Sequence, residues 1–168
     1  MTLGRNFLLA LFFILLQVKT LYSQSEFSKV ETDYYTSFIN YYQSDGICSY
    51  EFTDIIQDGM GLMWFATQDG LMRFDGNNFK TYRGGKTKGQ LPHSVVSSLA
   101  LDKQKNLWVG TKGGLCVYHP ESDTFERVDS LFGKPLQGHR WVSDIYVDSK
   151  GRLWVDRHNG TLNCIDFD

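Results

Sequence analysis

The sequence predicts an all-β fold: a partial β-propeller with about two complete four-stranded blades, an incomplete third blade and an N-terminal closing strand. The first observation behind this prediction is that Trp64, Trp108 and Trp154 stand 44 and 46 residues apart. The second is that an aspartate precedes each tryptophan by six residues and a glycine follows each by six. A period in the forties indicates one supersecondary unit copied in tandem. The expected copies are residues 52–94 (blade 1), 95–141 (blade 2) and 142–168 (incomplete blade 3).

The second copy shows the four expected strands most clearly. Its apolar runs alternate with polar, glycine-containing or proline-containing turns, and such runs are typical of antiparallel strands. Four short strands in roughly 45 residues match one propeller blade. The runs cover residues 96–101, 107–111, 115–118 and 125–128.

The recurring residues have physical roles in such a blade. An aspartate at the start of the first turn can accept hydrogen bonds from backbone amides two residues on. The glycines fall where a tight turn requires a positive φ angle. The tryptophans lie in the second strand, where a large flat ring fills the wedge between adjacent blades; the alternative is that each ring is a platform for a ligand. The aspartates are Asp58, Asp102 and Asp148, and the glycines are Gly70, Gly114 and Gly160.

Residues 38–43 are expected to be the closing outer strand, because Phe38–Tyr42 resembles the fourth-strand sequences Phe79–Tyr82 and Phe125–Val128. A lone outer strand at the N-terminus can complete the last blade of a closed ring and hide a sheet edge. The third copy has three strands, whereas a ring needs about 4–8 blades. We therefore expect the N-terminal piece of a longer protein, with the missing C-terminal blades as partners. The alternative is a short chain that closes a ring from several copies.

Residues 1–24 are expected to be a secretory signal peptide. Arg5 precedes an apolar stretch of ten residues, Phe7–Leu16, which is too short to span a membrane. Residues 25–37 would then be an exported lead-in. Without Arg5 and Lys19, the exported portion keeps all 19 acidic residues and 15 of the 17 basic ones, a net charge of −4. No basic stripe is present, which argues against nucleic acid as a partner.

Motifs for catalysis and metal binding are absent from the sequence. There is no Gly-x-Ser-x-Gly nucleophile elbow, no His-Glu-x-x-His pair and no phosphate-binding loop, so no catalytic residue, metal or cofactor is predicted. Cys48, Cys116 and Cys164 lack the spacing of metal ligands, and their disulfide state is left open. The four histidines fall at offsets in the repeat that look unrelated, which favours solvated loop residues.

One binding face is the remaining candidate site. In an up-and-down blade, the turn between the second and third strands and the connection between blades emerge on the same face. This face would carry the turn residues Gln68, Asp69, Lys112, His158 and Asn159 and the two connections between blades, residues 83–94 and 129–141. In the second connection, His139, Arg140 and Trp141 have no evident counterpart in the first. An aromatic ring beside cations can stack on a sugar ring or an anionic glycan. The alternative is that Trp141 packs under its own loop.

The repeats resemble those of the two-component regulator propeller family. The matching stretches run from Asp58 to Gly76 in the first copy and from Asn106 to Leu115 in the second. The third copy departs from the pattern, with Asp156-Arg157 in place of a Gly/Ala-Thr pair and Thr161 in place of leucine. An irregular third blade is therefore expected.

The resemblance implies the periplasmic sensor region of a hybrid sensor histidine kinase, an inner-membrane protein when full length, that responds to oligosaccharides. It also implies that the full-length form can dimerise. Kinase activity would lie outside these residues, so whether the chain belongs to an enzyme is left open. Two interpretations compete with this one. The first is a glycan-processing propeller, since Asp148-x-x-Gly-x-x-Trp154 faintly resembles the Asp-box of sialidases. The second is a scaffold propeller in another exported regulator.

Overall fold

The computed structural model describes residues 37–128 and 138–167. The chain divides into two compact units, Met1–Ile39 and Asn40–Asp168, and all the described strands belong to the second. In the first unit, Phe38 and Ile39 are exposed and lack regular secondary structure. The predicted signal peptide (residues 1–24) and nearly all of the predicted lead-in lie outside the described residues.

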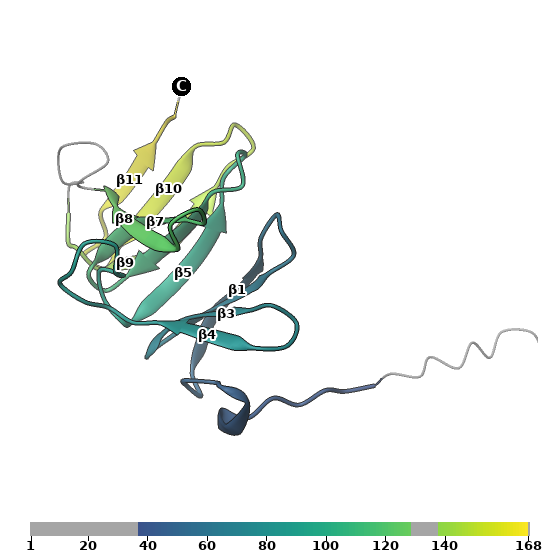
Figure 1. Cartoon of the computed structure of the whole chain (residues 1–168). Helices are drawn as coiled ribbons and strands as arrows, with labels where there is room; N and C mark the ends of the chain where they lie inside the picture. Colours follow the sequence, from purple (N-terminus) through teal and green to yellow (C-terminus); the bar gives the residue numbers. More distant parts are fainter. Residues whose placement is uncertain (1–36, 129–137, 168) are drawn as a thin grey trace, which may run out of the picture. The chain divides into compact units, whose positions relative to one another are not determined.

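The described residues form eleven strands in three antiparallel sheets of four, four and three strands (Figure 1). A short 3₁₀ helix, Gln43–Asp45, precedes them. The first sheet, in the order β1-β2-β3-β4, contains β1 (Phe52–Gln57), β2 (Met63–Thr67), β3 (Gly70–Phe74) and β4 (Phe79–Tyr82). The second, in the order β5-β6-β7-β8, contains β5 (Val96–Leu101), β6 (Leu107–Thr111), β7 (Gly114–His119) and β8 (Thr124–Arg127). The third, in the order β11-β10-β9, contains β9 (Val142–Val147), β10 (Leu153–Arg157) and β11 (Leu162–Ile165).

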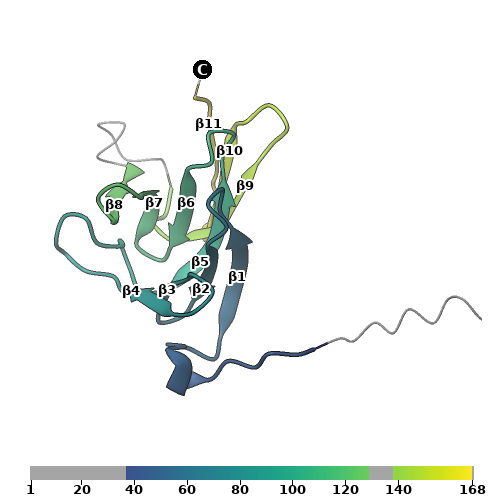
Figure 2. The same ribbon diagram turned by 45° about the vertical axis from the view of Figure 1, so that its right-hand side comes forward.

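The sheets stack as propeller blades. Their first strands β1, β5 and β9 lie next to one another, with β5 between the other two (Figure 2). All five residues of β6 are buried, because the second sheet is covered on both faces. In β10, buried and half-buried residues alternate, as expected for a sheet covered on one face. The predicted partial propeller, with two four-stranded blades and a three-stranded third, is confirmed.

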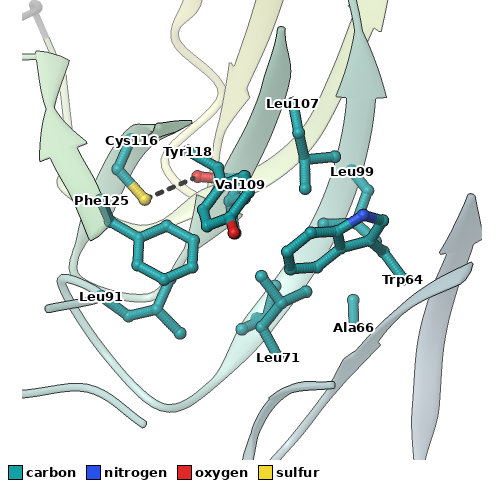
Figure 3. Packing of buried hydrophobic residues seen from close by; sticks show 11 residues of the cluster. Trp64, Ala66, Leu71, Leu91, Leu99, Leu107, Val109, Cys116, Tyr118 and Phe125 are labelled. Atoms are coloured by element: carbon teal, nitrogen blue, oxygen red, sulfur yellow. Dashed lines mark hydrogen bonds between the residues drawn. The ribbon is translucent and has the colours of Figure 1, made fainter. Parts of the chain in front are cut away.

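Two apolar clusters hold the sheets together. The cluster between the first and second sheets includes Trp64, Leu71, Leu107 and Tyr118 (Figure 3). The cluster between the second and third sheets contains Trp108, which is 2% exposed. Trp64 is fully buried, and its ring centroid lies 4.8 Å from that of Tyr118. Both indoles therefore fill the wedge between blades, as predicted from their spacing.

The repeated aspartate serves both the turn and the tryptophan. Asp58 accepts a hydrogen bond from the Met60 amide, two residues on, at 2.8 Å. The same carboxylate accepts the indole N–H of Trp64 at 2.8 Å. The indole bonds recur at 3.0 Å from Trp108 to Asp102 and from Trp154 to Asp148. The turn role was predicted from the sequence, and the link to the indole was not.

The repeated glycine closes the turn between the second and third strands. The φ angles of Gly70, Gly114 and Gly160 are 144°, 135° and 79°, as the turn geometry predicts. At Gly70 a Cβ atom would lie 2.7 Å from the carbonyl oxygen of Tyr82, so that position also requires a small residue. A threonine completes the turn, since Thr111 Oγ1 donates to the Gly114 carbonyl at 2.7 Å.

A row of hydroxyl groups joins the first strands of neighbouring sheets. Thr53 Oγ1 donates to the Val96 carbonyl at 2.7 Å, and Ser97 Oγ donates to the Val142 carbonyl at 2.5 Å. Each first strand also shifts its register at the same place, between the first and third residues of the strand. The third sheet keeps this shift, but its turn between the second and third strands differs. Pairing ends at Asp156 and Leu162 there, whereas Thr67 pairs with Gly70 and Thr111 with Gly114 in the other sheets.

Residues 38–43, the predicted closing strand, form no strand with the described sheets, and their pairing with a last blade stays a prediction. Residues 37–42 have no regular secondary structure, and Gln43 begins the 3₁₀ helix. A strand requires a partner's backbone groups to satisfy its own N–H and C=O groups. None of the three described sheets includes this segment. Tyr41, from the second unit, packs by its ring against Phe74 and Phe79 of the first sheet instead.

Candidate functional site

The predicted site residues gather at the junction of the second and third sheets. Lys112 lies in the β6–β7 turn, Trp141 directly precedes β9, and His158 lies in the β10–β11 turn. Two equivalent backbone bonds fix this arrangement. The Lys112 amide donates to the Val95 carbonyl at 3.0 Å, and the His158 amide donates to the Trp141 carbonyl at 3.1 Å. Trp141 therefore occupies the repeat position that holds Val95 in the second copy.

An aromatic pair with a neighbouring cation forms the centre of the site. The Trp141 and His158 rings stack, with centroids 3.9 Å apart and an interplanar angle of 15°. The Lys112 ammonium lies 4.9 Å from the Trp141 ring centroid, within cation–π distance. Trp141 is half-buried, whereas Lys112 and His158 are exposed.

His139 has a backbone role that corrects one step of the sequence interpretation. Its Nδ1 accepts the amide of Trp141 at 3.1 Å, just as His93 Nδ1 accepts the amide of Val95 at 3.0 Å. His139 and His93 thus occupy equivalent positions, and the segment before β9 does have a counterpart in the first connection. Both histidines precede the tryptophan of their own repeat by 15 residues, so their equivalence could have been predicted from the sequence. What is particular to the third copy is Trp141.

Arg157 binds the backbone of the segment that precedes Trp141. It replaces the turn threonine of the other copies and is only 4% exposed. Its Nη1 donates to the carbonyl of Arg140 at 3.1 Å and to that of His139 at 3.4 Å. Its Nε donates to Asn163 Oδ1 at 3.1 Å. The departure from the repeat noted in the sequence therefore holds the backbone next to Trp141.

Of the four predicted site residues, Lys112 and Trp141 are in contact, and His139 positions the Trp141 backbone. Arg140 is exposed, and its carbonyl rather than its side chain joins this network. His158 was expected on the same face, and the structure brings it into contact with Trp141. Arg157 was noted as a departure from the repeat but was not assigned to the site. The Asp129–Arg140 connection is described only from residue 138 onward.

The chemistry available at this site is recognition. An indole face, an imidazole and an ammonium group can bind a ring-shaped polar ligand by stacking and hydrogen bonding. Within the described ranges, no three His, Cys, Asp or Glu side chains are close enough to hold a metal ion. The described residues also contain no helix of the length and hydrophobicity that a membrane crossing requires.

The chain is similar in part to two-component regulator propellers and to a histidine kinase. A family model described as two component regulator propeller matches residues 90–113. A 39-residue stretch is 49% identical to histidine kinase P4 of Formosa agariphila, covering 23% of this chain and 3% of that protein. Residues 90–113 thus match the repeat of two-component regulator propellers.

Solved structures share the fold. The extracellular domain described as that of hybrid two component system BT3049 from B. thetaiotaomicron aligns with a TM-score of 0.67 and 24% identity, over 77% of this chain and 19% of that one. That of BT4673 from the same organism aligns with a TM-score of 0.57 and 26% identity, over 69% of this chain and 16% of that one. The chain thus spans less than a fifth of these relatives.

Proposed function

We propose that the chain is the N-terminal part of an extracytoplasmic sensor propeller in a two-component histidine kinase, and that it responds to oligosaccharides. The observation that carries the ligand proposal is the half-buried Trp141 ring, stacked on His158 and bordered by Lys112. Only the third of the three repeats has an aromatic residue at this position; the second has Val95 and the first has Glu51. A residue unique to one copy suits a site better than it suits blade packing.

The physical basis is the match between an indole and a sugar ring. The apolar C–H face of a pyranose packs on an aromatic ring, while its hydroxyl groups accept hydrogen bonds from Lys112 and the imidazoles. Arg157 fixes the backbone under the ring, which limits the entropy lost on binding. A carboxylate or sulfate on the sugar would gain a further attraction from Lys112 and Arg140.

The remaining parts of the proposal concern the whole protein. The predicted signal peptide and the extracellular domains of the structural relatives support a periplasmic location. Trp154 is half-buried on the outer face of the third sheet, and Tyr146 and Leu162 there are 66% and 59% exposed. We infer that further blades cover this face. Dimerisation and kinase output would belong to the longer protein.

Binding can be tested by calorimetric titration of the full chain with neutral and uronate-containing oligosaccharides. Trp141→Ala is expected to weaken the best ligand by about tenfold or more, equivalent to about 1.4 kcal/mol. Trp141→Phe should lose less because it keeps an aromatic face. Lys112→Ala should also weaken binding, whereas Lys150→Ala, an exposed lysine in the β9–β10 turn, serves as the matched control. Unchanged affinity in Trp141→Ala would contradict the proposed site.

A further inference from the structure

A second candidate site lies on the second blade, away from the residues discussed above. It is a pocket of about 610 Å³ between the β4–β5 connection and the outer strand β8. The connection is the long loop that follows β4 in Figure 2. A volume of this size is within the range of about 300–1,000 Å³ that small-molecule sites occupy. The lining residues are Lys86, Thr87, Lys88, Gly89, Gln90, His119, Thr124, Phe125, Glu126 and Arg127.

The loop that forms one wall is held firmly in place. Leu91 is fully buried in the cluster between the first and second sheets. The Gly85 amide donates to the Leu91 carbonyl at 3.1 Å, and the Phe125 amide of β8 donates to the Gly89 carbonyl at 2.9 Å. Gly89 has a φ of 90°, which favours glycine. The β4–β5 connection is therefore held by the burial of Leu91 and by a backbone hydrogen bond to β8.

The charge in the pocket comes from side chains and not from backbone amides. The amides of Thr87 and Gln90 are bound within the loop, to the Gln90 side chain and to the Thr87 carbonyl. Lys86 and Lys88 are exposed, and neither ammonium group has an ion pair or hydrogen bond among the described residues. Their charge is available to a ligand.

The third cation is on the opposite wall. Arg127 is half-buried on β8, and its Nη2 reaches the Gly85 carbonyl at 3.5 Å. The one carboxylate in the lining, Glu126, pairs with His119 at 3.0 Å. Three cations thus line the pocket in a chain whose net charge is −2, and they outnumber the one acid in its lining.

We propose that this pocket binds an anionic oxyacid group, a carboxylate or a sulfate, through Lys86, Lys88 and Arg127. Arg127 can hold two oxygens of such a group with its planar fork, while the lysines act as point charges. The group can arrive on a saccharide or as a free anion, and both share this chemistry. The proposal does not depend on Trp141, because it rests on a different blade position and different residues.

The test is a titration of the full chain, followed by NMR of backbone amides and by calorimetry. The probes are sodium sulfate, sodium phosphate, a uronic-acid oligosaccharide, a sulfated oligosaccharide and a neutral oligosaccharide of the same length. The anionic probes should shift the amides of Thr87 and Gly89. Binding by the inorganic ions alone would identify a free anion as the ligand, and tighter binding of the charged saccharides would identify a saccharide-borne group.

Removing the positive charges of the pocket should weaken the binding of the anionic probes. The double variant Lys86→Ala/Lys88→Ala is expected to weaken it by at least tenfold, and Arg127→Gln by a similar factor. The control Lys103→Ala/Lys150→Ala removes the same charge elsewhere and should bind normally. Trp141→Ala should bind sulfate and phosphate as wild type does and should show the same shifts of the Thr87 and Gly89 amides. Affinity should also fall as salt rises, since the Debye length shrinks to about 8 Å at 0.15 M. Three outcomes would overturn the proposal: equal shifts of the Thr87 and Gly89 amides with the neutral probe, no shift with any anionic probe, or unchanged sulfate affinity in both pocket variants.

Discussion

A single carboxylate shows how one residue can join two blades. Asp123, in the β7–β8 turn, accepts hydrogen bonds from the hydroxyls of Tyr82 at 2.5 Å and Tyr118 at 2.7 Å. Arg73 and Lys80 of the first sheet form ion pairs with the same group. Partial burial alone would raise the pKa of Asp123, but the hydrogen bonds from Lys80, Tyr82 and Tyr118 outweigh it and lower the pKa to about 2.

This lowered pKa predicts an acid-sensitive contact between blades. Since the folded pKa lies below the unfolded value of 3.8, the stabilisation is present above about pH 4 and is lost as pH falls towards 2. Asp123→Asn keeps the left-handed backbone conformation (φ 55°), because asparagine tolerates it. The variant should lose roughly 1 kcal/mol at pH 7, discounted for partial exposure, and its stability should fall less between pH 4 and 2.

Urea unfolding at several pH values measures this effect. Glu121→Gln, an exposed acid in the same turn, is the control and should follow the wild-type pH curve. If Asp123→Asn and wild type lost stability in parallel below pH 4, the contribution of Asp123 to acid sensitivity would be disproved.

In the turn between the first and second strands, one aspartate accepts the hydrogen bonds that hold the turn and the following tryptophan. Asp102 is 5% exposed and accepts the Asn106 amide, the Asn106 side chain and the Trp108 indole. Asp148 makes the equivalent indole bond and is half-buried. The hydrogen bond from Trp154 is the main reason why the pKa of Asp148 is lowered; the bonds from Arg152 lower it further, and desolvation opposes them. The same motif is thus buried in the second copy and partly exposed to solvent in the third.

Burial should decide the cost of breaking this motif. Asp102→Ala leaves the Trp108 N–H without an acceptor between two blades, and we expect a loss of roughly 1–3 kcal/mol in the free energy of unfolding. Asp148→Ala should lose less, because water can reach the half-buried Trp154. In a double-mutant cycle, Trp108→Phe should couple with Asp102→Ala by about 1 kcal/mol. A cycle with no coupling would show that the indole bond contributes nothing, and an equal loss in Asp148→Ala would count against the burial argument.

The whole molecule shows which features a repeat spacing reveals and which it does not. The strands, the turn aspartates, the glycine φ angles and the wedge tryptophans follow from local sequence and could be predicted. The closing strand could not be established from Phe38–Tyr42, because a strand depends on a partner edge that local similarity does not supply. The role of Arg157 was equally hidden, since its carbonyl partners at His139 and Arg140 lie 18 and 17 residues away. Such contacts between a turn and a connection depend on how the sheets stack, which the repeat spacing does not specify.

Blade stacking also predicts how local stability varies along the chain. The second sheet is covered on both faces, whereas the first and third each have a face with exposed apolar residues, such as Ile55 and Leu162, which are 54% and 59% exposed. Because each blade depends on its neighbours, opening should begin at the outer sheets and reach the middle sheet last. Amide hydrogen exchange of the full chain should be slowest in β6 and β7 and faster in β2 and β10. Adding a partner that covers the third sheet should slow exchange in β10 selectively. Equal exchange across β2, β6 and β10 would mean that the three sheets unfold as one unit, contrary to the nearest-neighbour behaviour expected of stacked repeats.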